Sequence, residues 1–223
     1  MRQKLLITGG AGFIGSVLTA YLIDHGYEVA VLDDLSTGHS KTIDARASFI
    51  QASILDKAAL IEALLGVNTV IHCAAKSLVE ESVSSPELYL QVNTEGTRVL
   101  LEAMKEAQVT NIVFSSTAAV YGDSKIQPIT ESSEINPVNP YGKSKIASER
   151  LISDSLSNGF AAITFRYFNV AGSYQSSTGQ LHIEDHKNET HLMRLDIIQG
   201  ANATANLWVT DAYSPGFKRN KNF

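Results

Sequence analysis

A glycine-rich segment near the N-terminus constrains the fold of this chain more than any other feature of the sequence. Gly9, Gly10, Gly12 and Gly15 lie between an apolar run that predicts a strand and an amphipathic run that predicts a helix. The glycines satisfy both G-x-G-x-x-G and G-x-x-G-x-x-G, and a strand before and a helix after such a loop are typical of a dinucleotide site. Glycine lets the backbone approach a pyrophosphate, and the free N–H groups of a helix N-terminus favour an anion.

The rest of the chain continues the alternation of strands and helices. Strands are expected at residues 4–8, 28–33, 48–51, 69–73, 111–115 and 161–166, and helices at residues 13–25, 56–65, 86–108 and 141–156. The expected strands are continuous apolar runs, which are typical of a parallel sheet covered on both faces. The fold class is therefore predicted as α/β, with a doubly wound parallel sheet of the Rossmann type. The polar, proline-containing residues 122–140 predict a functional loop or lid.

The alternation weakens after about residue 170. We expect a dinucleotide-binding Rossmann domain at residues 1–170 and a partial substrate-binding region with a divergent tail at residues 171–223. Within that second region, residues 192–199 predict a helix and residues 207–209 form a short apolar piece.

Composition excludes several classes of protein. The formal net charge of −5 argues against a nucleic-acid partner, which requires a basic surface. The only cysteine, Cys73, has no partner for an internal disulfide, and no apolar run is long enough to span a membrane. With no visible export signal, these features predict a cytoplasmic protein without a membrane partner.

Asp33 ends the second expected strand, close to the spacing at which an acidic residue hydrogen-bonds the adenosine ribose of a dinucleotide. A carboxylate at this position repels a 2′-phosphate. The sequence therefore favours NAD over NADP as the cofactor.

Tyr141 and Lys145 lie four residues apart and share one face of an expected helix. An ammonium beside a tyrosine favours the phenolate and lowers the pKa of the phenol, so that the tyrosine can transfer a proton near neutral pH. The preceding strand ends in Ser115, Ser116 and Thr117, at the sheet edge where open α/β folds bind ligands. A hydroxyl, a tyrosine and a lysine together predict proton transfer coupled to hydride transfer by NAD.

Histidine and acidic residues gather at His182, Glu184, Asp185, His186 and His191. Their spacing fits no metalloenzyme pattern, and we expect no metal site. His72 and Cys73 end an apolar strand, where we expect both side chains to be packed.

These segments together resemble the extended short-chain dehydrogenase/reductase family and, within it, the UDP-glucose 4-epimerases. The resemblance covers residues 1–193 and is carried by residues 8–15, 33–38, 72–82, 115–122, 141–145, 166–169, 184–186 and 189–192. The glycine loop and the Tyr-Lys spacing are shared by the whole superfamily, whereas residues 74–79 and 115–122 are more typical of epimerases. Ala118 and Ala119 stand where related sugar-nucleotide dehydratases carry an acidic pair, which argues against dehydration.

The resemblance implies NAD-dependent epimerisation at C4 of a UDP-hexose through a transient 4-keto sugar. Tyr141 would move the proton of the sugar 4-hydroxyl, Thr117 would hydrogen-bond the 4-oxygen, and Lys145 would bind the nicotinamide ribose. Other implied cofactor contacts are Gly9, Gly12, Phe13, Ile14, Gly15, Asp33, Asp34, Leu35, Ser36, Thr37, Gly38, Ser53, Ile54, Cys73, Ala74, Ala75, Ser77, Asn93 and Phe168. Thr117, Tyr141, Asn169, His191 and Leu192 would contact the UDP-sugar substrate, and a homodimer would pair residues 94–107 and 141–156.

The chain departs from the family pattern at a few places. Ala52 and Ser53 replace a Gly-Asp pair whose carboxylate contacts adenine, and Arg194 replaces a proline. Family members also continue well beyond residue 223, so the substrate-binding part is expected to be incomplete and turnover impaired. Two alternatives stay open: a related reductase acting on another nucleotide sugar, and a non-catalytic NAD-binding module.

Overall fold

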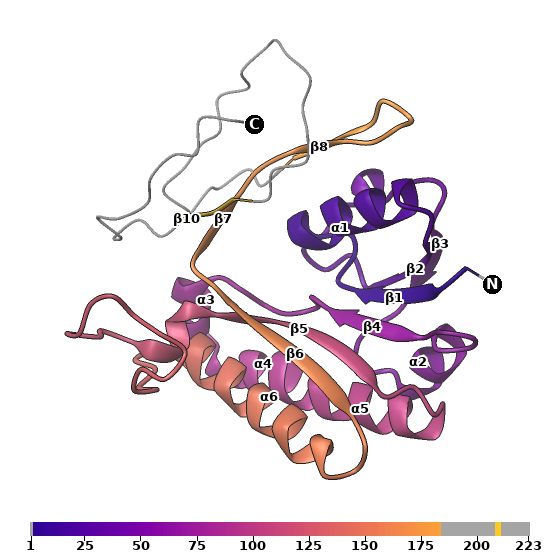
Figure 1. The fold of residues 1–223 in the computed structure, drawn as a ribbon. Coiled ribbons are helices and arrows are strands. Elements are labelled where there is room, and N and C mark those ends of the chain that lie inside the picture. Colours follow the sequence, from indigo (N-terminus) through magenta and orange to yellow (C-terminus); the bar gives the residue numbers. More distant parts are fainter. Residues whose placement is uncertain (1, 184–207, 211–223) are drawn as a thin grey trace.

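A six-stranded parallel sheet forms the centre of the structure (Figure 1). The computed structural model describes residues 2–183 and 208–210. The sheet has the order β3-β2-β1-β4-β5-β6, and its strands are β1 (Lys4–Thr8), β2 (Glu28–Asp33), β3 (Ser48–Gln51), β4 (Thr69–His72), β5 (Asn111–Thr117) and β6 (Ala161–Tyr167). This order confirms the predicted Rossmann fold. The direction of winding reverses between β1 and β4, and ligands of such folds bind at the carboxyl ends of the strands there.

Helices lie on both sides of the sheet (Figure 1). Helix α1 (Phe13–Asp24) packs over β1 and β2 on one side. The helices on the other side are α2 (Lys57–Ala63), α3 (Val79–Ser84), α4 (Pro86–Tyr89), α5 (Gly96–Glu106) and α6 (Pro140–Leu156). Short 3₁₀ turns occur at η1 (Ser40–Thr42) and η3 (Ala118–Tyr121).

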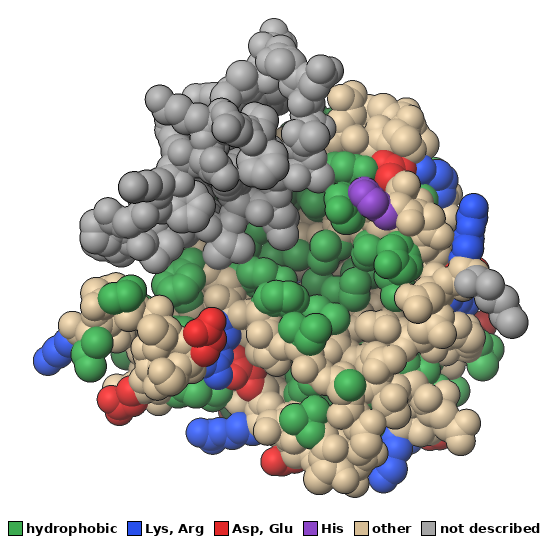
Figure 2. All heavy atoms as spheres, in the orientation of Figure 1, with side chains coloured by type: hydrophobic (Ala, Val, Ile, Leu, Met, Phe, Trp, Pro, Cys, Tyr) green, Lys and Arg blue, Asp and Glu red, His purple; other side chains and the backbone are tan. Residues whose placement is uncertain are grey.

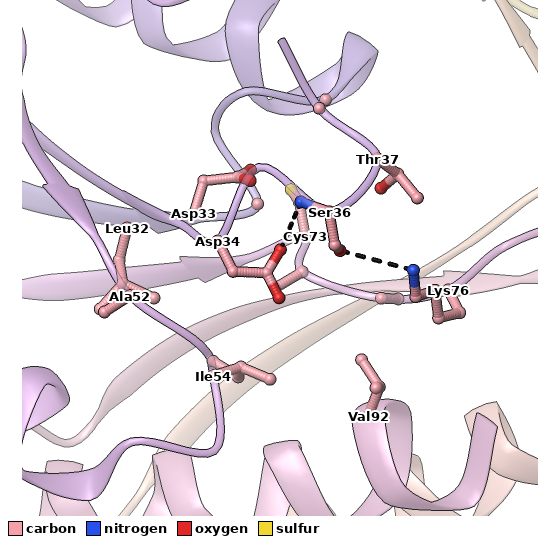
Figure 3. Close-up of a pocket in the computed structure, with 15 residues that line it drawn as sticks. Leu32, Asp33, Asp34, Ser36, Thr37, Ala52, Ile54, Cys73, Lys76 and Val92 are labelled. Carbon is pink, nitrogen blue, oxygen red and sulfur yellow. Dashed lines mark hydrogen bonds between the residues drawn. The ribbon is translucent and has the colours of Figure 1, made fainter. Parts of the chain in front are cut away.

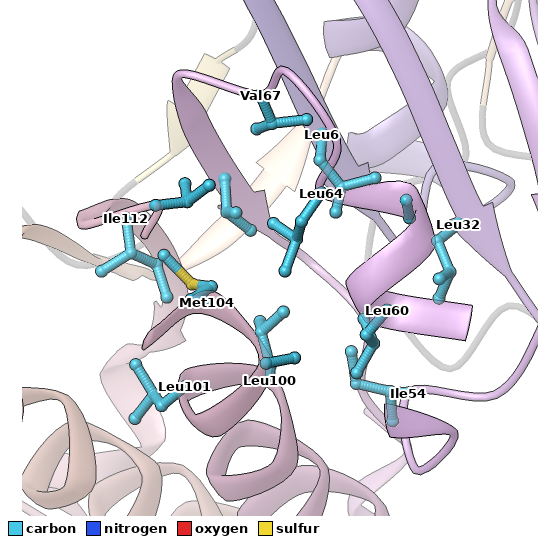
Figure 4. Packing of buried hydrophobic residues seen from close by; sticks show 14 of the residues in the cluster. Leu6, Leu32, Ile54, Leu60, Leu64, Val67, Leu100, Leu101, Met104 and Ile112 are labelled. Carbon is cyan, nitrogen blue, oxygen red and sulfur yellow. The ribbon is translucent and has the colours of Figure 1, made fainter. Parts of the chain in front are cut away.

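The alternation of side chains along β1 explains why its sequence is apolar throughout. Leu6 is fully buried in the larger core, where it meets Leu60, Leu64 and Leu100 (Figure 4). Its neighbour Ile7 is also fully buried, in a second cluster beneath α1. Because successive side chains point to opposite faces, a strand buried on both faces shows no polar alternation.

Strand β6 differs from β1 because one of its faces is exposed. Ile163 and Phe165 point away from α6 and are 56% and 46% exposed. Figure 2 shows hydrophobic side chains gathered across the side of the molecule on which β6 faces the viewer. The expected burial on both faces therefore holds for β1 but not for β6 in the part of the chain that the structure describes.

The single helix expected at residues 86–108 is divided into three parts. A π-helical segment, η2 (Leu90–Glu95), separates α4 from α5. Within it, the Asn93 carbonyl oxygen accepts hydrogen bonds from the Thr97 hydroxyl at 2.6 Å and the Ser148 hydroxyl at 2.9 Å. Hydroxyl groups thus compete for the backbone of this turn, which is a known way to disturb a regular helix.

Beyond β6 the chain crosses the sheet and packs on α1 (Figure 1). Strand β7 (Asn169–Ala171) pairs with β10 (Trp208–Thr210), and β8 (Tyr174–Gln175) forms a hairpin with β9 (Leu181–His182). Tyr174 of this hairpin packs beside Val17 and donates a hydrogen bond of 2.6 Å to Asp24. The hairpin had no signal in the sequence, and the helix expected at residues 192–199 lies outside the described residues. The division expected at residue 170 stays a prediction.

His72 joins β1, β4 and α5 through a buried chain of hydrogen bonds. Its Nδ1 lies 2.7 Å from the Thr8 hydroxyl, and its Nε2 lies 3.1 Å from the Thr97 hydroxyl. Because the Thr97 hydroxyl donates its proton to the Asn93 carbonyl, it accepts from His72, so the ring is the neutral Nε2–H tautomer. Burial and the charge of Lys145 lower the pKa of His72 to about 3.

We expect the folded state to lose stability below pH 6.5 through His72. The unfolded chain binds a proton near pH 6.5 whereas the folded chain does not, so lowering the pH from 7.5 to 5.5 removes about 1.4 kcal/mol. Urea unfolding at both pH values measures this loss. His72→Asn is expected to show a smaller pH dependence than the wild type. Equal pH dependence in His72→Asn and wild type would contradict the assignment.

Candidate active site

The glycines of the first loop have different structural tasks. A Cβ on Gly9, which has a φ of +73°, would lie 2.5 Å from the Ala74 nitrogen, and a Cβ on Gly15 would lie 2.2 Å from the Gly9 oxygen. A Cβ on Gly10 would collide with Val31 of β2. Gly12 is different, because its Cβ would meet only the Gly9 oxygen, at 3.4 Å. Gly9 and Gly15 thus bring strands and helix together, and Gly12 leaves the backbone open to a ligand.

Helix α1 presents its N-terminus beside this opening. It begins at Phe13 with Gly12 as its N-cap, and no side chain among the described residues caps it. No acidic residue lies in its first turn. The first N–H groups of a helix lack partners within the helix, so those of Phe13 and Ile14 are suited to bind an anion.

A pocket opens at the point where the strand order reverses (Figure 3). Its lining comprises Gly9, Gly12, Leu32, Asp33, Asp34, Ser36, Thr37, Gly38, Ala52, Ile54, Cys73, Ala74, Ala75, Lys76 and Val92. Figure 3 shows Lys76 extending toward Ser36 across the pocket, with 3.4 Å between the Lys76 ammonium and the Ser36 hydroxyl. The pocket thus has one cationic side chain near the glycine loop.

Asp33 connects the pocket to the loops around it. Its carboxylate accepts hydrogen bonds from the Ala11 N–H at 2.9 Å and the Leu35 N–H at 2.8 Å. Burial raises the pKa of Asp33, and these two N–H groups counteract that rise. A carboxylate offers about four acceptor positions, so the side chain retains capacity for hydroxyl groups of a ligand.

The opposite part of the pocket is apolar. Leu32, Ala52, Ile54 and Val92 line it (Figure 3). Ser53 does not line it, and its hydroxyl accepts a hydrogen bond of 3.2 Å from the Leu55 N–H. A flat aromatic ring suits such a surface, since it loses little on leaving water.

Tyr141 lies in the first turn of α6. The Asn139 side chain caps this helix by accepting from the Gly142 N–H at 2.8 Å, and Pro140 occupies the first helical position. Tyr141 forms a hydrogen bond with Thr117 at the end of β5, and Tyr89 packs edge-on against its ring at 6.3 Å. The start of α6 therefore fixes the phenol at the carboxyl edge of the sheet.

Lys145 is buried one turn further along α6. Its ammonium donates a hydrogen bond of 2.8 Å to the Ser115 carbonyl and lies 4.8 Å from the centre of the Phe114 ring. Burial lowers the pKa of Lys145 to about 8, and Cys73 and Glu149 counteract this effect. Lys145 thus lies between the ends of β4 and β5, next to the pocket wall formed by Cys73.

The predicted effect of Lys145 on Tyr141 is wrong for this structure. We expected the ammonium to lower the pKa of the phenol, but burial raises it, and the hydrogen bond with Thr117 only partly counteracts the rise. The reason is that both side chains are buried, and burial disfavours the charged form of each. The Lys145 ammonium is directed at the Ser115 carbonyl, and its own pKa falls because of burial.

Asn93 uses its side chain to hold two segments of the site. Its amide accepts from the Lys76 N–H at 2.8 Å, and donates to the Lys76 carbonyl at 3.0 Å and the Ser144 hydroxyl at 2.9 Å. These contacts tie the pocket loop to α6, between Tyr141 and Lys145. Asn93 is thus a support of the site, and it does not line the pocket.

The structure brings only part of the expected cofactor set into the pocket. The expected residues outside its lining are Phe13, Ile14, Gly15, Leu35, Ser53, Ser77, Asn93, Tyr141, Lys145 and Phe168. Four lining residues had not been expected, namely Leu32, Ala52, Lys76 and Val92. Lys76 could have been found from its cationic side chain within residues 72–82, whereas the other three give no chemical signal.

The remaining expected residues lie away from the pocket or outside the described chain. Phe168 is 37% exposed beyond β6, and Asn169 begins β7. His191 and Leu192 lie outside the described residues. Within residues 2–183, no three histidine, cysteine or acidic side chains gather as a metal site would require. In that same part of the chain, we find no helix with the length and apolar character of a membrane span.

Comparison with known proteins identifies the family. Residues 5–197 match the model of the NAD dependent epimerase/dehydratase family. The chain belongs to this family. It is 42% identical over 194 residues to a UDP-glucose 4-epimerase of Corynebacterium glutamicum and 45% identical over 194 residues to one of Lactobacillus helveticus. These alignments cover 86% of this chain but 57% and 58% of the relatives, so the chain spans little more than half of their length.

Solved structures agree with this family membership. The UDP-glucose 4-epimerase of Brucella ovis in complex with NAD is 39% identical and superposes with a TM-score of 0.80, over 85% of this chain and 58% of that one. The enzyme of Thermotoga maritima with UDP-glucose is 35% identical and has a TM-score of 0.74, over 78% of this chain and 58% of that one.

The glycine geometry predicts opposite results for two alanine variants. Gly15→Ala is expected to lose about 2 kcal/mol or more of stability, because its Cβ overlaps the Gly9 carbonyl oxygen. Gly12→Ala is expected to stay within about 1 kcal/mol of the wild type, since its backbone is extended and its Cβ meets one atom at 3.4 Å. Urea unfolding measures both. Equal losses in the two variants would contradict the separation of tasks.

Proposed function

We propose that this chain carries the NAD-binding and proton-transferring part of an epimerase that acts at C4 of a UDP-hexose. The observation that carries the proposal is the position of Thr117, Tyr141 and Lys145 at the carboxyl ends of β4 and β5, beside a pocket with a glycine loop and a helix N-terminus. Family membership and the 4-epimerases among the relatives support it.

The pocket fits NAD part by part. The backbone of Gly12, Phe13 and Ile14 would bind the pyrophosphate, and the Lys76 ammonium would offset its charge. Asp33 would accept from the adenosine ribose, and its charge disfavours a 2′-phosphate. The apolar side chains would enclose adenine. The carboxylate with which family members contact adenine is replaced here by Ser53, so it would not take part.

Further residues from the sequence prediction are proposed to complete the cofactor site. Gly9 and Gly15 shape the loop, and Lys145 would bind the nicotinamide ribose. The other proposed contacts are Asp34, Leu35, Ser36, Thr37, Gly38, Ser53, Ile54, Cys73, Ala74, Ala75, Ser77, Asn93, Tyr141 and Phe168.

Tyr141 would take the proton from the sugar 4-hydroxyl and return it after the sugar has turned over. Thr117 would hydrogen-bond the 4-oxygen and hold it beside the phenol. When bound, NAD supplies the acceptor and donor of hydride at the sugar carbon. The burial that raises the pKa of Tyr141 favours the protonated phenol, so ionisation requires added positive charge nearby. The cationic nicotinamide of a bound cofactor would provide such charge, whereas the Lys145 ammonium is directed at the Ser115 carbonyl.

The substrate and the assembly belong to the same proposal. The Thermotoga maritima relative was solved with UDP-glucose, which supports a UDP-sugar here. Asn169, His191 and Leu192 are proposed to contact it, as part of a substrate-binding region at residues 171–223. The proposed assembly is a homodimer that pairs residues 94–107 and 141–156. The proposed location is cytoplasmic, with Cys73 as a free thiol.

Two other functions fit some of the observations. A reductase acting on a different nucleotide sugar would use the same proton-transferring group, and substrate profiling separates it from an epimerase. A non-catalytic NAD-binding module would retain the pocket without needing Tyr141. The contact between Thr117 and Tyr141 favours an enzyme.

We expect purified chain to release about one NAD per chain on denaturation, because the glycine loop, Asp33 and the apolar wall of the pocket suit the pyrophosphate, ribose and adenine. Enzymatic quantification of NAD after acid or heat denaturation measures this. Gly12→Ala is the matched control, since it should fold and yet release much less NAD. Wild-type chain that is folded by circular dichroism and releases no dinucleotide would contradict the proposed cofactor site.

Tyr141→Phe separates an enzyme from a binding module. The variant retains the ring and loses the proton, so conversion of UDP-galactose to UDP-glucose should fall about 100-fold or more while the amount of bound NAD stays the same. Coupled assay of UDP-glucose formation measures turnover. Turnover in Tyr141→Phe equal to that of wild type would exclude this tyrosine as the proton-transferring group.

A further inference from the structure

Helix α6 is fastened to the end of β5 by three side chains that share one face. Tyr141, Lys145 and Glu149 follow one another at intervals of four residues. Tyr141 forms a hydrogen bond with Thr117, and the Lys145 ammonium donates to the Ser115 carbonyl at 2.8 Å. The third contact lies between these two on the strand, because the Ser116 hydroxyl donates to the Glu149 carboxylate. Three consecutive residues of β5 therefore each hold one side chain of α6.

The Glu149 carboxylate is in turn held by Arg166 of β6. The Arg166 Nε lies 3.0 Å from Glu149 Oε1, and Nη2 lies 2.6 Å from Oε2, so the ion pair is bidentate. Nη1 donates to the Tyr121 hydroxyl at 2.9 Å, and the guanidinium lies over the Tyr121 ring. Arg166 pairs with Ser116 in the sheet register. The network therefore joins β5, β6, α6 and η3, and its Ser116 directly precedes Thr117.

We propose that Glu149, held by Arg166, is a positioning residue that sets α6, and with it Tyr141 and Lys145, against the end of β5. The proposal rests on the proposed function of Tyr141 and Lys145, and it assigns them a partner outside the pocket. Glu149 is not among the residues that line the cofactor pocket. It acts on the reacting tyrosine through the helix that both share.

The groups that face Lys145 make its charge sensitive to Glu149. From β4 these are His72, which is neutral, and the Cys73 thiol, whose pKa burial raises to about 12. From its own helix the facing group is Glu149, which favours the charged lysine. Tyr141 faces Thr117 and Tyr89, and the Tyr89 hydroxyl lies 2.8 Å from the Glu81 carboxylate. Cys73 and then Glu149 counteract the effect of burial on the pKa of Lys145, and Glu149 is the carboxylate of the two.

Carbon-13 NMR of the full chain tests the proposal without requiring turnover. The chain is labelled at the lysine ε-carbon and the tyrosine ζ-carbon, and Lys145→Met and Tyr141→Phe assign the two resonances. In Glu149→Gln, the pKa of Lys145 is expected to fall below that of the wild type, because an opposite charge is lost while the shape is retained. Glu102→Gln is the matched control, since this glutamate forms an exposed ion pair with Arg98 on α5.

Ser116→Ala provides a milder second variant. It removes one fastening of α6 and retains the charge of Glu149, so the pKa of Lys145 should stay constant while the Tyr141 ζ-carbon resonance moves. An unchanged Lys145 titration in Glu149→Gln, or an unmoved Tyr141 resonance in Ser116→Ala, would overturn the proposal; if Glu149→Gln does not fold, the Ser116→Ala result decides. The NMR readouts need no cofactor, so a failure of the proposed function, seen as absence of released NAD, is distinguishable from a failure here.

Discussion

The close contact between Gly15 and the Gly9 carbonyl oxygen determines where α1 lies, and the pocket depends on it. Any side chain at residue 15 would force the helix away from β1. Because α1 is held so close, its N-terminus is directed at the point where the strand order reverses. The open side of Gly12 and the unpaired N–H groups of α1 then form one surface, which suits a diphosphate.

A second constraint acts on the proton-transferring groups, which are held by the same helix that covers the core. Ile146 and Ile152 of α6 are buried while Tyr141 and Lys145 face the end of β5. Burial disfavours the charged form of both groups, so it raises the pKa of Tyr141 and lowers the pKa of Lys145. The protonation of the site therefore depends on neighbouring charges, and for Lys145 these include Glu149.

The sequence predicted the sheet well because its signals are local. Apolar runs located all six strands of the parallel sheet to within two residues at each end, and the glycine loop located the pocket. The π-helical segment at Leu90–Glu95 was missed, since its backbone contacts residues that are distant in sequence, such as the Ser148 hydroxyl on the Asn93 carbonyl. The pKa of Tyr141 was predicted in the wrong direction, because spacing on a helix indicates which residues are neighbours but not how far both are removed from water.

Burial also governs the reactivity of the Cys73 thiol. It is the only thiol in the sequence, and it is part of the pocket wall. With a pKa of about 12, fewer than about one molecule in ten thousand carries the thiolate at pH 7.5, and the thiolate is the form that reacts with oxidants and alkylating agents. The folded chain should therefore resist oxidative cross-linking of two copies in air, and a thiol that becomes readily alkylated would report that the ends of β1 and β4 have separated.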